Sequence, residues 1–247
     1  MKTFEDFGMA VGDAPQSPAT GDAVELAVTT YNDLGLLTDE GKAREAFGEA
    51  VETFAATLPE SVTSQPYDIV MVPKLGELSL GDLIGRYDQL TGQKGNPSTY
   101  VWSGLWDKYS DTEFNQGQTV DIEPRAVLLG GENDYDEAGL YFTNQNLKAQ
   151  RKSLKEAQKN HDSNETTLGS LSVAGYMVRN AMQLERGEQL MDRPTFTRFI
   201  ELDKKRADDF SYVPSADSFD GGQVHLRRSY EVARSHGGVR LSVGPKA

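Results

Sequence analysis

Three histidines and no cysteine restrict the chemistry that this chain of 247 residues could carry out. His161, His225 and His236 are not spaced as neighbours on one helix face, and no H-E-x-x-H zinc pattern is present. Without cysteine there can be no disulfide, thiolate ligand or cysteine nucleophile. No Gly-x-Ser-x-Gly turn is present either, although a Ser–His–Asp triad assembles in space rather than in sequence. We therefore assign no catalytic residue, metal ligand or cofactor, and expect a protein that is not an enzyme.

Glycines, carboxylates and tryptophans between residues 102 and 136 suggest sites that the surrounding sequence does not complete. Gly130-Gly131 follows an apolar run, but acids come directly after it and would repel a phosphate there. The acidic loops at 111–117 and 133–136 lack, in sequence, the remaining oxygen ligands that calcium requires. Trp102 and Trp106 have helical spacing, which favours a role in the core over a sugar platform. These features are interpreted as turns and core residues.

The charge of the chain is unevenly distributed along the sequence. Residues 1–178 hold 13 Lys and Arg against 28 Asp and Glu, a net charge of −15, whereas residues 179–247 hold 12 against 10, a net charge of +2. The acidic part would repel phosphate backbones, so we expect no binding of nucleic acid. Basic residues between 148 and 159 could contact phosphate, but a solvated helix face accounts for them.

The last third of the chain contains residue types that are typical of recognition surfaces. Apolar residues alternate in this part and predict strands with one buried face. Tyrosine and arginine offer large contact areas and directional hydrogen bonds, which interfaces use preferentially. The residues expected to face solvent, and therefore proposed as ligand-binding, are Tyr212, His225, Arg227, Tyr230 and Arg234.

Hydrophobic periodicity and capping residues predict an α+β protein. Helices are expected at 22–34, 38–58, 79–90, 143–160 and 172–187, with Ser172 and Gly187 as caps of the last one. Another helix is expected from residue 96 to 109, with a strand at 99–103 as the competing interpretation. Strands are expected at 67–72, 119–122, 125–129, 195–202, 211–213, 223–227 and 239–243.

These elements predict three portions of the chain. They are a flexible lead-in at 1–21, a mainly helical portion with a few short strands at 22–165, and a β-rich portion at 166–247, divided at the polar residues 161–166. No secretory signal or apolar membrane span is visible, so a soluble protein, cytoplasmic by default, is expected.

Residues 174–244 resemble the C-terminal part of C-type-lectin-like proteins, specifically the variable proteins diversified by diversity-generating retroelements. The resemblance is carried by Gly175-Tyr176-Met177-Val178-Arg179-Asn180-Ala181-Met182, Met191-Asp192, Phe196-Thr197-Arg198-Phe199, Gly221-Gly222, Arg227-Arg228-Ser229-Tyr230 and Gly238-Val239-Arg240-Leu241-Ser242. In that family a Gly-Val-Arg-Leu-like string forms the last core strand, and diverse residues before it lie on an exposed face. Here Arg228-Ser229-Tyr230 replaces the family's Gly-Gly-Ser-Trp-like element. The related formylglycine-generating enzymes work through cysteines, which this chain lacks.

The resemblance implies a small, irregular C-terminal β region of C-type-lectin-like type and a function in binding. We expect a non-enzymatic ligand- or receptor-binding protein that displays a variable surface from residues 210–236 toward another protein or surface macromolecule. A structural or assembly protein, such as a virus-particle component, is the alternative, and homo-oligomers are compatible with both. A hydrolase with carboxylate or Ser/His chemistry is the third hypothesis.

Overall fold

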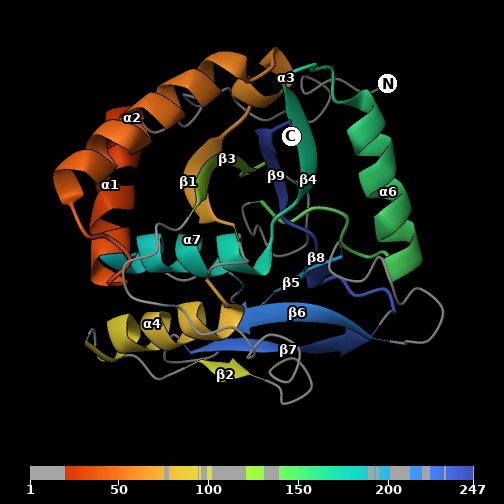
Figure 1. Ribbon diagram of the computed structural model, residues 1–247. Coiled ribbons are helices and arrows are strands. Elements are labelled where there is room, and N and C mark those ends of the chain that lie inside the picture. Colours follow the sequence, from red (N-terminus) through yellow and green to blue (C-terminus); the bar gives the residue numbers. More distant parts are fainter. Residues whose placement is uncertain are drawn as a thin grey trace.

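The computed structural model shows a mixed architecture of helices and two β-sheets (Figure 1). It describes residues 20–74, 78–93, 95, 99–101, 121–130, 139–188, 192, 195–200, 212–218, 223–230 and 232–246. The helices are α1 (Thr20–Asp33), α2 (Glu40–Thr57), α3 (Glu60–Thr63), α4 (Leu80–Gln93), α6 (Leu147–Asn160) and α7 (Val173–Arg186). The strands are β1 (Tyr67–Pro73), β2 (Tyr100–Val101), β3 (Ile122–Leu128), β4 (Thr166–Ser170), β5 (Phe196–Arg198), β6 (Tyr212–Ser218), β7 (Val224–Tyr230), β8 (Gly237–Gly238) and β9 (Leu241–Pro245). In this described part, no helix is both long and apolar enough to cross a membrane.

The expected helical hairpin at the start of the chain is confirmed as α1 and α2. The side chain of Asp39 caps α2 by accepting a hydrogen bond of 3.1 Å from the amide of Lys42. The helix ends at Thr57, because Pro59 cannot continue it. The hydroxyl of Tyr31 donates to the carbonyl of Met71 over 2.8 Å, which fixes α1 against β1. Apolar residues of both helices, including Ala27, Val51 and Phe54, are buried in the core.

One sheet has four antiparallel strands in the order β1-β3-β9-β4. The strand β9 lies in its centre, where Val127 pairs with Ser242 on one side and Leu168 with Val243 on the other. Strands from both sides of residue 165 thus share one sheet, so the expected division at that residue does not separate two sheets. The strand β4 was not predicted, because Thr166–Ser170 is short and only one of its residues is strongly apolar.

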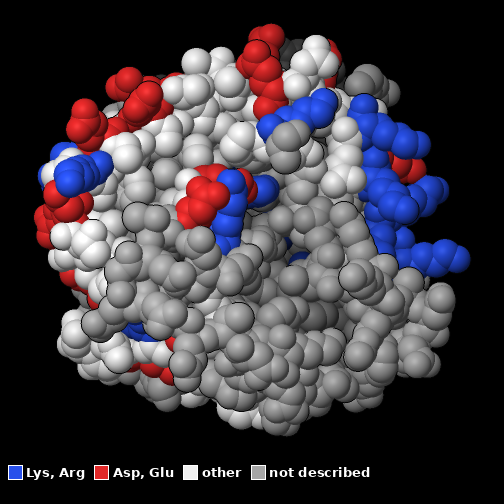
Figure 2. Space-filling model, viewed as in Figure 1, with Lys and Arg blue, Asp and Glu red and all other residues white. Residues whose placement is uncertain are grey.

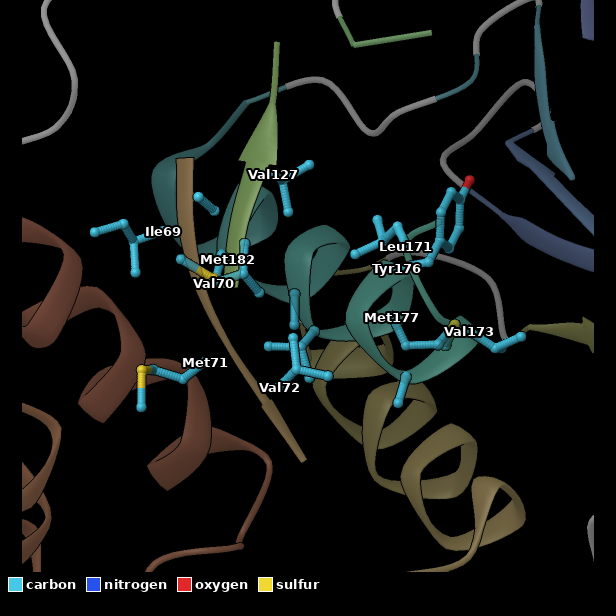
Figure 3. Close-up of a cluster of buried hydrophobic side chains, with 14 of the residues drawn as sticks. Ile69, Val70, Met71, Val72, Val127, Leu171, Val173, Tyr176, Met177 and Met182 are labelled. Atoms are coloured by element: carbon cyan, nitrogen blue, oxygen red, sulfur yellow. The ribbon is translucent and has the colours of Figure 1, made fainter. Parts of the chain in front are cut away.

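The helix α7 packs between the four-stranded sheet and α4 (Figure 1). Its predicted caps are confirmed, because the hydroxyl of Ser172 accepts from the amide of Gly175 over 3.1 Å and Gly187 ends the helix at φ 67°. Apolar side chains of α7 face β1 and β3 to form the centre of the core (Figure 3). At the rim, the guanidinium of Arg179 pairs with Asp68 on β1 over 2.8 Å.

The second sheet has the order β2-β7-β6-β5-β8. The strand β6 pairs with β5 and β7 in antiparallel fashion, while β2 and β8 are parallel to their neighbours. At residues 100–101 the competing interpretation, a strand, is therefore correct. Expected strands at 211–213 and 223–227 are longer than predicted, and the one at 195–202 is shorter.

The helix α6 begins later than the expected start at residue 143. Phe142 and Asn144 both have φ of 59°, a left-handed conformation that cannot continue a helix. Asn146 caps the helix instead, by accepting from the amide of Ala149 over 2.9 Å. The expected lead-in is shorter than predicted, since α1 already begins at Thr20, and residues 1–19 lie outside the described part, as do both acidic loops and the two tryptophans.

Candidate functional site

The strands β6 and β7 form a hairpin whose two faces differ in character. The apolar residues Ala216, Val224 and Leu226 are at most 2% exposed and point into the core. The alternate positions carry His225 and Arg227, which are paired in register with Asp217 and Ser215 of β6. Because strand residues alternate between faces, these polar side chains share the face opposite to the core residues. Two of the five residues expected at the ligand surface are thereby brought together.

A buried carboxylate lies between the side chains of His225 and Arg227. Asp217 is 4% exposed, and its Oδ2 forms an ion pair with the guanidinium of Arg227. Its Oδ1 lies 3.7 Å from Nδ1 of His225 and has no hydrogen-bond partner among the described residues. The side chain of Arg227 remains 42% exposed, so Asp217 orients the guanidinium while leaving much of it open to a partner.

His225 is held by contacts on both of its ring sides. Its Nε2 lies 3.0 Å from Oε1 of Gln223, and its ring centroid lies 5.3 Å from that of Tyr100. Burial lowers the pKa of His225, which favours the neutral ring at pH 7. The ring is therefore a hydrogen-bonding group rather than a fixed positive charge.

Tyr100 completes this surface from a distant part of the sequence. It is on β2, directly beside His225 in the parallel pairing with β7. With 51% exposure, it is an exposed large hydrophobic side chain, which is the kind of residue that anchors interfaces. Tyr100 was not predicted as a site residue, because the sequence favoured a helix at 96–109 over a strand at 99–103, and only the pairing with β7 reveals its position. We call Tyr100, His225 and Arg227, together with Asp217 behind them, the hairpin face.

The remaining expected site residues have different outcomes. Tyr212 and Tyr230 pair with each other in the backbone register. Position 230 is an odd number of residues from positions 225 and 227, so the register places this pair at positions of the other strand face and does not bring it onto the hairpin face. Their side chains lie outside the described part of the structure. Arg234 is exposed in the turn after β7, where its carbonyl accepts from the amides of Asn144 (2.9 Å) and Gly237 (3.3 Å). No described contact joins Arg234 to the hairpin face.

The turn that carries Arg234 is supported by a buried arginine on β5. Arg198 is fully buried, and its Nη2 donates to the carbonyl of Val232 over 2.7 Å. Its Nη1 donates to Oε1 of Gln150 on α6 over 3.0 Å. Burial, with the nearby charge of Arg234, lowers the pKa of Arg198 to about 10, so the group remains protonated at neutral pH. This arginine links β5, α6 and the turn into one rigid unit.

A second buried arginine fixes the segment before the last strand. Arg240 and Asp192 are both fully buried, and Nη2 of the arginine lies 3.0 Å from Oδ1 of the carboxylate. Asp192 also accepts from the hydroxyls of Thr195 (2.9 Å) and Thr197 (2.7 Å), and Nε of Arg240 contacts the Thr197 hydroxyl over 3.1 Å. Asp192 has φ of 64°, which an Asp side chain tolerates better than most others. We call Asp192, Thr195, Thr197 and Arg240 the buried ion network.

Close packing explains the pair of glycines in β8. A Cβ atom on Gly237 would lie 2.2 Å from the ring of Phe196, and one on Gly238 would lie 2.6 Å from the carbonyl oxygen of Tyr141. Any side chain would therefore push the chain away from β5 or from residue 141. In the Gly-Gly-Val-Arg-Leu string, the two glycines thus allow close packing against Phe196 and Tyr141, and the arginine is the buried Arg240.

The described residues offer little support for a reaction centre. No group of three or more His, Asp or Glu that could hold a metal ion occurs among them. His161 contacts the hydroxyl of Thr166 over 2.8 Å, and the ring of His236 packs edge-on against Phe196 at 5.4 Å. Each of the three histidines therefore has different neighbours. Comparisons with protein-family models, curated proteins and solved structures found no match to this chain.

Proposed function

We propose that this chain is a non-enzymatic binding protein that displays a diversified surface on its C-terminal sheet, as the resemblance to variable proteins of C-type-lectin-like fold implies. The surface is the hairpin face, and the partner is another protein or a surface macromolecule. The observation that carries the proposal is the half-exposed guanidinium of Arg227, held by the buried carboxylate of Asp217, on the same strand face as His225, whose ring packs against the exposed Tyr100. Aromatic and arginine side chains in such an arrangement are the usual anchors of protein interfaces.

The support beneath the hairpin face favours recognition by a preorganised surface. The buried ion network and Arg198 connect β5 to β9, α6 and the turn at 232–236 through hydrogen bonds of defined geometry. A rigid backbone lowers the conformational entropy that is lost on binding. Residues on the solvent side of the hairpin can then be substituted without loss of the fold, as long as the buried residues on its core side are kept.

Sequence reads of this locus from many cells test the proposal. Substitutions should be concentrated in codons 210–236 and should follow the strand period of two. Codons 225 and 227 are expected to vary, whereas codons 216, 224 and 226 should encode small or apolar residues throughout, because those residues are buried. A uniform distribution of substitutions along the chain, or variation that ignores this alternation, would contradict the proposal.

A further inference from the structure

The helix α6 carries a concentrated positive charge on its outer face. Leu147, Gln150 and Leu154 are buried against the body of the protein. The other positions hold five basic residues and one acid, Glu156, which gives the helix a net charge of +4. Figure 2 shows these side chains as a blue band along one flank of the molecule. The basic residues are Lys148, Arg151, Lys152, Lys155 and Lys159.

Most of these charges have no carboxylate partner among the described residues, unlike most other basic residues in that part of the chain. Arg44 pairs with Glu25 over 2.7 Å, and Arg179 pairs with Asp68 over 2.8 Å. On α6, among the described residues, only Lys152 has a carboxylate partner, Glu156, at 3.7 Å. Four cationic side chains on one helix are therefore left for solvent or for an external partner.

The complementary charge lies on the opposite flank of the same molecule, on α1 and α2 (Figures 1 and 2). Residues 20–58 hold eight Asp and Glu against two basic residues, a net charge of −6. Both basic residues already pair with acids, Lys42 with Asp39 and Arg44 with Glu25. The exposed acids Glu45, Glu49 and Glu52 make no ion pair in the described part of the chain.

The acidic and basic residues have the same helical spacing. Positions 45, 49 and 52 on α2 match positions 155, 151 and 148 on α6 when the two helices run in opposite directions. In both sets the outer residues are separated by about 10 Å along the helix axis, at roughly 1.5 Å per residue. The antiparallel direction also places the helix dipoles favourably.

We propose that α6 of one copy of this protein docks against α2 of a second copy. The contacts would be Lys148 with Glu52, Arg151 with Glu49, and Lys155 with Glu45. The overall charge of −13 argues against a polyanion as the partner of α6. Between two copies the same net charge is repulsive, but salt screens it beyond roughly 8 Å at physiological ionic strength, whereas pairs in direct contact are screened less.

The two docking surfaces are different and lie on opposite flanks, so the contact is heterologous. When two copies associate, one keeps a free α2 surface and the other a free α6 surface. Further copies can therefore add to form an open chain or a ring, and no closed two-fold dimer results. Exposed ion pairs contribute little individually, so the association is weak and becomes important only at high local concentration. This inference is independent of the proposed ligand surface.

Sedimentation velocity of the intact chain tests the proposal. The average mass should rise between about 10 μM and about 1 mM protein, a range suited to weak association. It should fall again when the salt concentration is raised from about 0.1 M to about 0.5 M. An average mass that stays at one copy throughout this range would overturn the proposal.

Charge reversal identifies the surfaces. The variant Lys148→Glu/Lys155→Glu and the variant Glu45→Lys/Glu52→Lys should each associate at least about tenfold more weakly, because each places like charges in contact. An equimolar mixture of the two should recover association, because the reversed surfaces match each other. Lys74→Glu/Lys246→Glu is the control, with the same change in net charge as the first variant but outside α2 and α6.

Two outcomes would refute the assignment of these surfaces. One is association in which the control is weakened as much as the α6 variant, or in which the mixture does not recover. The other is a wild-type protein that stays monomeric while it binds anionic vesicles or heparin, with that binding lost in the α6 variant. The basic face would then serve an anionic partner rather than a second copy.

Discussion

Replacement of Arg240 by methionine tests whether the buried ion network holds the C-terminal sheet together. The substitution keeps much of the side-chain volume but leaves the carboxylate of Asp192 without its cationic partner, at a site with no solvent exposure. Removal of one member of a buried ion pair typically costs about 3–5 kcal/mol of unfolding free energy. Hydroxyl groups of Thr195 and Thr197 still donate to the carboxylate, so we expect a loss of about 3 kcal/mol, at the lower end of this range.

Urea denaturation at pH 7 and 25 °C measures this loss. A matched control is Arg44→Met, which removes the arginine from an exposed pair with Glu25. That pair is surrounded by water, so its removal should change the unfolding midpoint far less. The double variant Asp192→Asn/Arg240→Met removes both charges and should recover part of the lost stability, since no uncompensated charge remains buried.

If Arg240→Met is no more destabilising than Arg44→Met, the buried ion network does not hold the sheet together. The same conclusion follows if Asp192→Asn/Arg240→Met is less stable than Arg240→Met alone. Domains are typically stable by only about 5–15 kcal/mol, so a loss of this size can leave Arg240→Met unfolded. In that case Arg240→Lys, which retains the positive charge, should fold and lie between the wild type and the double variant.

Three further predictions concern buried groups. Tyr87→Phe should leave the urea midpoint unchanged or raise it, because the buried hydroxyl of Tyr87 has no hydrogen-bond partner in the described part of the chain. Gly238→Ala should destabilise by more than about 2 kcal/mol, because its Cβ would lie 2.6 Å from a backbone oxygen, whereas Gly48→Ala, with open space in α2, should stabilise by about 0.5–1 kcal/mol. NMR titration should show His225 and His236 with a pKa below the ordinary value of about 6.5, because burial disfavours the charged ring. Below about pH 6.5 the unfolded chain therefore binds more protons at these two histidines than the folded protein does. The contribution of the two neutral rings to stability is complete above about pH 6.5 and is lost as the pH falls through their lowered pKa values. A measured pKa at or above about 6.5 for either histidine would contradict this prediction.

The helices were largely predictable because their signals are local. The apolar stripe of α2, the cap of α7 at Ser172 and its end at Gly187 all lie within a few residues of the structure that they specify. The start of α6 was predicted too early, because nothing in the sequence indicates that Phe142 and Asn144 take up left-handed conformations. The same segment makes contacts with distant residues, since Tyr141 pairs with Val239 and the amide of Asn144 donates to the carbonyl of Arg234 over 2.9 Å.

The candidate site was predictable only in part, because some of its residues meet through contacts between distant parts of the chain. Alternation along β7 places His225 and Arg227 on one face, and this could be read from the sequence. The contribution of Tyr100 depends on parallel pairing between strands that are more than a hundred residues apart, and no local pattern reports it. Asp217 could have been found by extending the strand at 211–213, since it would then stand opposite His225.

The central position of β9 has a consequence for how this protein is made. The strand β3 is complete about 110 residues before β9 begins, and its edge cannot be filled until β9 has been synthesised. At a translation rate of roughly 5–20 residues per second, that edge waits for about 5–20 seconds on the ribosome. An unpaired strand edge is a template for pairing with other chains. Slowly translated messages or crowded polysomes should therefore favour aggregation of the nascent protein, and chaperones that shield strand edges should improve its yield.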